Sequence, residues 1–272
     1  MSEGYFINEK IDYFFPLGVV LMQNRSHEDF HVSCRIGRDC QFHAVFDGHG
    51  GGNKDNLELQ ANHVALYIHK YLVHHLIYSL QGISYDNEAL IKEAIIKSFE
   101  EVDRHLHSSG ATSGATCCCV LVLPKRIIVC NLGDSQLYAF KGNKIKFSTT
   151  AHNAVSEEAR IKSNGGYVVR GRLNGIYLPS RSFGDFQAKT RGKAYFSPAP
   201  MGIVPDITFL PREDYDFLIL ATDGITDGIP NKETVEKIVR ESKKRNLIVD
   251  DLAKIAAKNN GKDDIACLLI DL

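Results

Sequence analysis

Three aspartates in this 272-residue chain adjoin strongly apolar segments, in a pattern that suits metal chemistry. Asp47 follows "FHAVF" and Asp223 follows "FLILAT", each with a glycine directly after it, and Asp263 stands just before "IACLLI". The apolar runs predict β-strands. Because the end of one antiparallel strand lies beside the start of its neighbour, we expect the three carboxylates to gather at one edge of a sheet.

Carboxylates gathered in this way repel one another, and a divalent cation between them relieves the repulsion. Oxygen ligands suit Mg²⁺ or Mn²⁺, and the sequence lacks the histidine and cysteine spacing of a zinc site. Gly48 lets the backbone approach closely, so its carbonyl is another candidate ligand. Taken singly, an Asp-Gly pair is also typical of a turn, and the acidic pair Glu28 and Asp29 is typical of a solvated turn.

The elements that would position these residues follow from the spacing of apolar residues. The strand-like runs are residues 17–23, 30–36, 41–46, 116–123, 126–132, 135–140, 216–222 and 265–272. The segments with helical spacing are 61–76, 91–106, 232–245 and 248–258, and residues 164–184 are expected to be irregular. This order, with its short connections, predicts an α+β fold of mostly antiparallel sheets covered by helices.

Composition limits the class of protein. Hydrophobic residues make up 44% and charged residues 24%, as in globular domains, and a net charge of −1 provides no general attraction to nucleic acid or membrane. The seven cysteines, three of them consecutive, argue against a disulfide framework and for a reducing compartment. We expect one domain over residues 1–272, a monomer in the cytoplasm with nuclear access left open, and no membrane or nucleic-acid partner.

Seven segments, taken in order, resemble the metal-dependent protein serine/threonine phosphatases of the 2C family. They are "HED" (27–29), "VFDGHGG" (45–51), "SGAT" (113–116), "NLGDSQ" (131–136), the long segment 157–189, "ATDGITD" (221–227) and 252–270. The resemblance extends from about Leu17 to Leu272. It implies a four-layer α-β-β-α sandwich, in which two central, mostly antiparallel sheets are flanked by helices.

The resemblance also implies a hydrolase with two Mn²⁺ or Mg²⁺ ions that acts on phosphoserine and phosphothreonine proteins. By position, the metal ligands would be Asp47 as the bridging ligand, the Gly48 carbonyl, Asp223, Asp263 and, through a water, Glu28. A third, weaker ion, which some members bind, would lie at Asp134 and Asp227.

In such a centre a hydroxide that bridges the two ions attacks phosphorus in line. His49, two residues after the bridging Asp47, is then placed to protonate the leaving serine or threonine oxygen as general acid. Of the eleven histidines only His49 has this spacing.

Four positions depart from the family pattern, and none of them removes a predicted metal ligand. Asn24 stands where the family has its phosphate-binding arginine, while Gln136, Ala151 and Asp264 replace an arginine, an aspartate and an asparagine. Arg25 is adjacent to Asn24. Because neighbouring residues on a strand face opposite ways, Arg25 would bind the phosphate only if a bulge or shift re-aims it.

Two alternatives to an active protein phosphatase stay open. One is a catalytically weak or inactive phosphatase-like protein that acts as a binding or regulatory module, which Asn24 favours and the retained aspartates disfavour. The other is a phosphohydrolase of small metabolites, because a metal centre by itself does not recognise a peptide.

Overall fold

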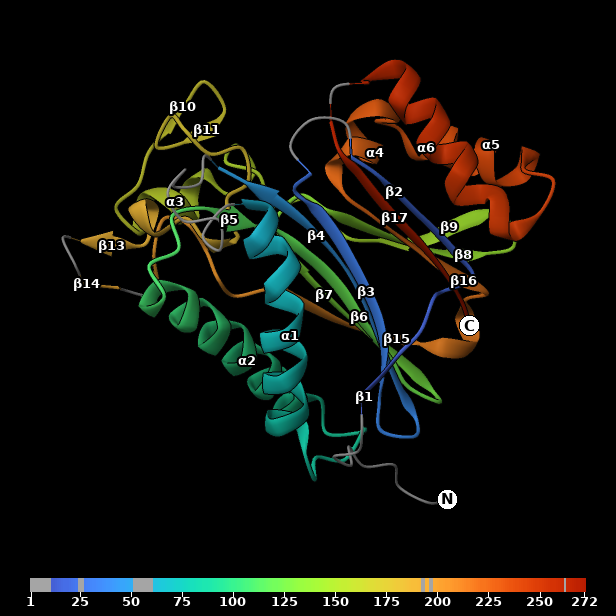
Figure 1. Ribbon diagram of the computed structural model, residues 1–272, viewed down its shortest axis with the longest axis horizontal. Helices are drawn as coiled ribbons and strands as arrows, with labels where there is room; N and C mark the ends of the chain where they lie inside the picture. Colours follow the sequence, from blue (N-terminus) through green and yellow to red (C-terminus); the bar gives the residue numbers. More distant parts are fainter. Residues whose placement is uncertain (1–10, 24–26, 51–60, 192–193, 196–197, 262) are drawn as a thin grey trace.

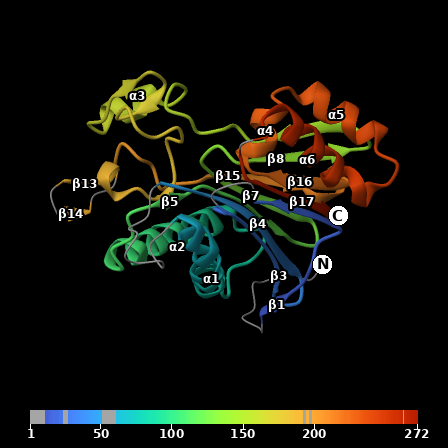
Figure 2. The same ribbon diagram turned by 45° about the horizontal axis from the view of Figure 1, so that its top comes forward.

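Two antiparallel sheets face each other at the centre of the protein, and helices cover their outer faces (Figures 1 and 2). The computed structural model describes residues 11–23, 27–50, 61–191, 194–195, 198–261 and 263–272. This arrangement confirms the predicted α+β fold with four layers. It also places the two sheets so that the ends of their strands meet along common edges.

Each sheet has a regular order of antiparallel strands. The larger sheet runs β1 (Ile11–Tyr13), β3 (Asp29–Ile36), β4 (Cys40–His49), β6 (Cys117–Val122), β7 (Arg126–Leu132) and β15 (Asp206–Pro211). Two short strands extend it beside β4, namely β5 (Gly114–Ala115) and β12 (Phe183–Gly184). The smaller sheet runs β2 (Gly18–Met22), β17 (Ile265–Asp271), β16 (Phe217–Ala221), β8 (Gln136–Lys141) and β9 (Lys144–Ser148).

Alternating side chains give the central strands two apolar faces, because successive residues of a strand point to opposite sides of the sheet. In β6, Cys117, Cys119 and Leu121 belong to the core under the helices, whereas Cys118 and Val120 belong to the layer between the sheets. All seven cysteines are free and buried, so they act as small apolar strand residues.

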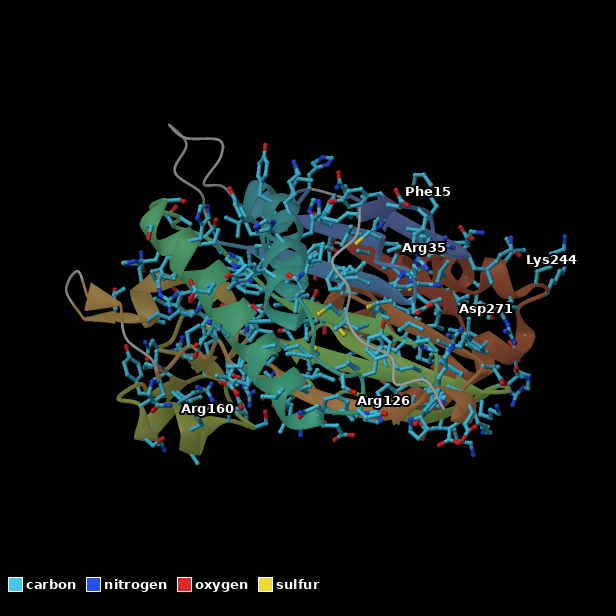
Figure 3. All side chains as sticks on the ribbon, turned by 90° about the horizontal axis from the view of Figure 1, so that it is seen from below. Phe15, Arg35, Arg126, Arg160, Lys244 and Asp271 are labelled. Carbon is cyan, nitrogen blue, oxygen red and sulfur yellow. The ribbon has the colours of Figure 1, made fainter. Side chains whose placement is uncertain are left out.

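The helices form the outer layers. α1 (Ala61–Leu80) and α2 (Glu88–Ser108) pack on the larger sheet, and α4 (Asp223–Gly228), α5 (Lys232–Glu241) and α6 (Ile248–Asn259) pack on the smaller one. Asn87 caps α2 by accepting a hydrogen bond from the Leu90 amide at 3.1 Å. Arg126, labelled in Figure 3, donates to Asp86 at 2.9 Å and thereby ties the start of α2 to the larger sheet.

Several local features differ from the prediction. β4 does not end at residue 46 but continues through Asp47 to His49, because β5 pairs with its last two residues. Asp223 starts the short helix α4 rather than a turn, and α5 ends at Glu241, four residues early, before a 3₁₀ turn at Arg245–Leu247. A Cβ atom on Gly224 would lie 2.0 Å from the Asp264 carbonyl oxygen, so this glycine permits close packing against the start of β17.

Apart from β12, which belongs to the larger sheet, the described residues of 151–204 lie beside the sandwich and have a small core of their own. The segment includes α3 (Glu158–Ser163), β10 (Val168–Val169), β11 (Arg172–Leu173), a 3₁₀ turn (Phe186–Ala188), β13 (Thr190–Arg191) and β14 (Ala194–Tyr195). Its buried apolar residues are Ala154, Ile161, Leu173, Ala188 and Met201. A further 3₁₀ turn (Arg212–Asp214) follows β15. No helix in the described part of the chain is both long and apolar enough to cross a bilayer.

Glu157 links separate parts of the segment 151–204 through hydrogen bonds and ion pairs. It accepts hydrogen bonds from Arg181, Arg160 and Ser180; burial opposes its ionisation, but these partners lower its pKa from 4.5 to about 2. Glu157→Gln should therefore reduce the free energy of unfolding at neutral pH by about 2–3 kcal/mol. A depressed pKa stabilises the fold above the unfolded pKa, so this difference should shrink as pH falls from 4.5 toward about 2.

Urea unfolding across this pH range measures the effect. Glu158→Gln is the matched control, because Glu158 forms a surface ion pair with Lys162 in which both side chains are substantially exposed. A Glu157→Gln difference that does not change with pH would contradict the assigned ion pairs.

Candidate metal centre

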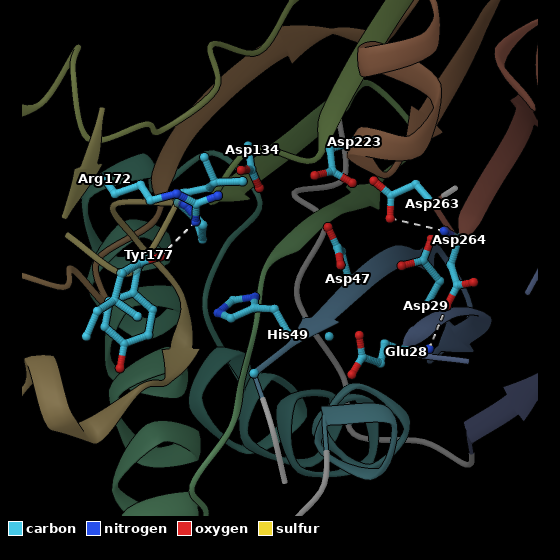
Figure 4. A pocket seen from close by; sticks show the side chains of 15 residues that line it. Glu28, Asp29, Asp47, His49, Asp134, Arg172, Tyr177, Asp223, Asp263 and Asp264 are labelled. Atoms are coloured by element: carbon cyan, nitrogen blue, oxygen red, sulfur yellow. Dashed lines mark hydrogen bonds between the residues drawn. The ribbon is translucent and has the colours of Figure 1, made fainter. Parts of the chain in front are cut away.

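The acidic residues singled out in the sequence, except Asp227, line one pocket at the edge where the two sheets meet (Figure 4). The pocket has a volume of about 330 Å³. Its polar and charged lining residues include Glu28, Asp29, Asp47, His49, Asp134, Arg172, Tyr177, Asp223, Asp263 and Asp264, and Gly48 also lines it. Carboxylates from separate parts of the chain therefore line the same pocket.

Strand ends and crossings between the sheets position these carboxylates. Asp47 in β4 lies opposite Asp29 in β3. Asp223 follows β16, and Asp263 lies two residues before β17, the neighbour of β16 in the smaller sheet. Asp134 lies in the connection from β7 in the larger sheet to β8 in the smaller one. All five residues thus reach the pocket from backbone that the sandwich itself fixes.

The carboxylates form two overlapping groups that could each hold a metal ion. Oxygen atoms of Asp47, Asp134 and Asp223 lie within 4.8 Å of one another, and so do those of Asp223, Asp227 and Asp263. Asp223 belongs to both groups. The resemblance linked Asp134 only to a third ion, but its carboxylate lies in the same group as that of Asp47. Glu28 lines the pocket without belonging to either group.

The electrostatics of the pocket favour bound cations. Burial, followed by the carboxylates of Asp223 and Asp29, raises the pKa of Asp47 well above its usual range. Burial and the carboxylates of Asp134 and Asp263 likewise raise the pKa of Asp223. Each carboxylate is therefore costly to ionise beside the others, and a cation would remove that cost.

Asp134 adds a separate observation on how well the residues fit a metal. Its Oδ1 atom is buried and has no hydrogen-bond partner among the described residues. An unpaired buried carboxylate oxygen is costly unless a ligand satisfies it. Together with the other carboxylate oxygens and the nearby backbone, it makes a donor set that suits hard divalent cations.

Asp29 and Asp264 form the polar base of the pocket. Thr222 Oγ1 donates to Asp29 Oδ2 at 2.7 Å and accepts from the Ala266 amide at 2.9 Å, which links β3 of the larger sheet to the smaller sheet. The Glu28 amide donates to Asp264 Oδ2 at 2.9 Å. A carboxylate oxygen serves as this acceptor as well as an asparagine oxygen would, so the departure at Asp264 keeps this hydrogen bond.

His49 lies in the pocket beside Asp47, and its Nε2 donates to Asp185 Oδ2 at 2.6 Å. Burial lowers the pKa of His49, but the carboxylates of Asp185, Asp134 and Glu28 together more than compensate, so the net shift is upward. Sequence analysis missed Asp185. It lies within the long segment that resembles the family, but no spacing rule connects two residues 136 positions apart.

Arg172 is the single lysine or arginine among the described residues that line the pocket. It donates to the Ile176 carbonyl at 2.8 Å and extends from β11 toward Asp134 in Figure 4. Arg25, predicted to contact the phosphate, and Asn24 lie outside the described residues.

Comparison with known proteins identifies the family. The sequence matches the model of Protein phosphatase 2C over residues 21–265. This chain belongs to the protein phosphatase 2C family. Members of this family are protein serine/threonine phosphatases, and the family is metal-dependent.

Individual relatives agree with this assignment. The chain is 30% identical over 266 residues to Probable protein phosphatase 2C 17 of Arabidopsis thaliana, covering 91% of this chain and 84% of that protein. It is 30% identical over 237 residues to protein phosphatase 1B of Homo sapiens, covering 80% and 46%. A serine-threonine phosphatase 2C structure from Toxoplasma gondii has a TM-score of 0.70 at 19% identity, covering 96% of this chain and 98% of that one, which supports the fold.

Thermal unfolding of Asp223→Asn tests the role of carboxylate repulsion. Because Asp223 belongs to both groups, the variant should be more stable than the wild type in chelator by about 1 kcal/mol, or ~2–4 °C. Mn²⁺ should raise the melting temperature of the wild type and have much less effect on the variant.

The matched control is Asp214→Asn, which changes an exposed aspartate outside the pocket. It should behave like the wild type in chelator and in Mn²⁺. If Mn²⁺ raised the melting temperature of Asp223→Asn as much as that of the wild type, Asp223 would not be a metal ligand.

Proposed function

We propose that this chain is an active Mn²⁺- or Mg²⁺-dependent phosphatase that hydrolyses phosphoserine and phosphothreonine in proteins. The observation that carries the proposal is the set of mutually repelling carboxylates beside His49 and Arg172 in one pocket. The names of the relatives support phosphoproteins as the substrate class. Seven free, buried thiols suit a reducing compartment, and we propose a monomeric, single catalytic domain in the cytoplasm.

Two ions would be held by the residues that the sequence singled out. The ligands in the proposal are Asp47, the Gly48 carbonyl, Asp223, Asp263 and, through a water, Glu28, with Asp134 and Asp227 for a third ion. When bound, such ions activate a water for in-line attack on phosphorus and stabilise the charge on the phosphoryl oxygens.

His49 and Arg172 would perform the remaining steps. His49 stands beside the carboxylates with Nε2 bound to Asp185, so its other ring nitrogen is available to protonate the leaving oxygen as the P–O bond breaks. The guanidinium of Arg172 brings positive charge to the pocket and would help to hold the substrate phosphate. Arg25 remains a second candidate for that contact.

Hydrolysis of p-nitrophenyl phosphate and of a phosphothreonine peptide tests the activity. We expect phosphate release with Mn²⁺ that is lost in chelator and that falls at least about 10²-fold in Asp47→Ala, since the ions would lose a shared ligand. Asp214→Ala is the control and should retain wild-type rates.

The outcomes separate the alternatives. Equal rates of hydrolysis in Asp47→Ala and wild type would contradict the assignment of Asp47 as a metal ligand. A wild-type protein that gains thermal stability from Mn²⁺ yet hydrolyses neither substrate would instead be the binding or regulatory module, and hydrolysis of small phosphate esters without the peptide would indicate a metabolite phosphohydrolase.

His49→Gln tests the general acid. A serine or threonine alkoxide needs a proton to leave, whereas p-nitrophenolate leaves readily without one. The kcat for the phosphothreonine peptide should therefore fall by about 10²-fold or more, and the kcat for p-nitrophenyl phosphate by clearly less. His74→Gln, an exposed histidine on α1, is the control. Equal losses on both substrates would contradict the acid role.

A further inference from the structure

Asp185 contacts His49 from an unusual and tightly held backbone position. Its side chain is 2% exposed, and its Oδ2 atom accepts hydrogen bonds from Ser182 Oγ at 2.5 Å and from His49 Nε2 at 2.6 Å. The residue has φ +53° and ψ 43°, in the left-handed region that side chains other than glycine seldom adopt. Such a conformation persists only where the surrounding structure holds it.

Gly114 provides the space for this contact. In the short strand β5, Gly114 pairs with His49 of β4 on one side and with Gly184 of β12 on the other. A Cβ atom on Gly114 would lie 2.4 Å from Asp185 Oδ2, the atom that accepts from His49. The missing side chain thus lets a carboxylate from one strand end reach an imidazole two strands away.

A buried ion pair between Asp103 of α2 and Lys189 holds the backbone of Ser182 and Gly184, which lead into Asp185. Lys189 Nζ donates to both oxygens of Asp103 at 3.0 Å and to the Ser182 carbonyl at 2.6 Å. The Gly184 amide donates to Asp103 Oδ1 at 2.7 Å. Asp103 and Lys189 are 0% and 1% exposed, so their charges are paired away from water and from the pocket.

We propose that Asp185 is the positioning residue of His49, and that Gly114 and the Asp103–Lys189 ion pair hold Asp185 in place for this task. The inference rests on the acid role proposed for His49. Since an ionised carboxylate only accepts hydrogen bonds, Nε2 must carry a hydrogen, and the proton for the substrate must be on Nδ1. Asp185 therefore selects which nitrogen acts and directs it toward the pocket.

The proton transfer balances without any further reactant. As the P–O bond breaks, its electron pair stays on the serine or threonine oxygen, which takes the proton from Nδ1 of His49. The imidazole is left neutral with its Nε2 hydrogen still donated to Asp185. Water later returns a proton to Nδ1.

Asp185→Asn is the first test, because it keeps the size of the side chain and removes its charge. The loss in kcat for the phosphothreonine peptide should exceed the loss for p-nitrophenyl phosphate by at least about tenfold, with little change in KM. Added to His49→Gln, Asp185→Asn should cause less than about twofold further loss, because both changes remove the same step. Asp216→Asn, which lies directly before β16 and outside the pocket, is the control.

Gly114→Ala moves the same carboxylate without changing a polar group, and it should show the same selective loss. If Gly114→Ala does not fold, Asp185→Asn alone decides. Equal losses of Asp185→Asn on both substrates, or a full further loss on top of His49→Gln, would mean that Asp185 only supports the fold and would overturn the inference.

Nuclear magnetic resonance of the imidazole nitrogens separates this inference from the proposed function. With Mg²⁺ present and at a pH at which the ring is neutral, His49, assigned by comparison with His49→Gln, should show one tautomer with the hydrogen on Nε2, and Asp185→Asn should lose that preference. An unchanged pattern in Asp185→Asn would refute the positioning role. If the wild type hydrolyses neither substrate, the proposed function fails, and this spectrum still decides whether Asp185 orients His49.

Discussion

The apolar layer shared by the two sheets determines where polar chemistry can lie in this protein. Val45, Cys118, Leu218 and Leu268 help to fill that layer, and polar groups without partners are costly there. Chain segments that cross from one sheet to the other must therefore pass at its edges. The crossing from β7 to β8 brings Asp134 to the same edge as the strand ends, so the carboxylates meet as a consequence of how the sheets stack.

Carboxylates at such an edge repel one another, so each needs a hydrogen-bond partner or a cation. The hydroxyl of Thr222 fixes Asp29 at the base of the pocket, and the Glu28 amide fixes Asp264, so these two acidic groups have partners within the chain. Asp134 has a buried oxygen without such a partner among the described residues. Polar groups at this edge thus divide into those that hold the sheets together and those whose oxygens remain available to a cation.

Much of the fold could be predicted because the central strands and α2 have clear apolar periodicity. The edge strands β9 and β15 were missed since they are half-exposed and lack a continuous apolar pattern. The end of β4 was misjudged because its partner β5 is a two-residue strand with no sequence signal. Asp47, Asp223 and Asp263 could be found from local sequence, whereas Asp185 could not, because its contact with His49 depends on tertiary structure and on the empty space at Gly114.

The buried cysteines have a consequence for chemical sensitivity. Burial raises the pKa of the Cys34 thiol to about 12, and Cys118 and Cys267 are shifted upward for the same reason. Peroxide and alkylating reagents attack exposed thiolates, and this chain has all of its thiols protonated and covered. Such oxidants inactivate hydrolases that rely on a thiolate nucleophile, whereas none of the described residues that line this pocket carries a sulfur atom.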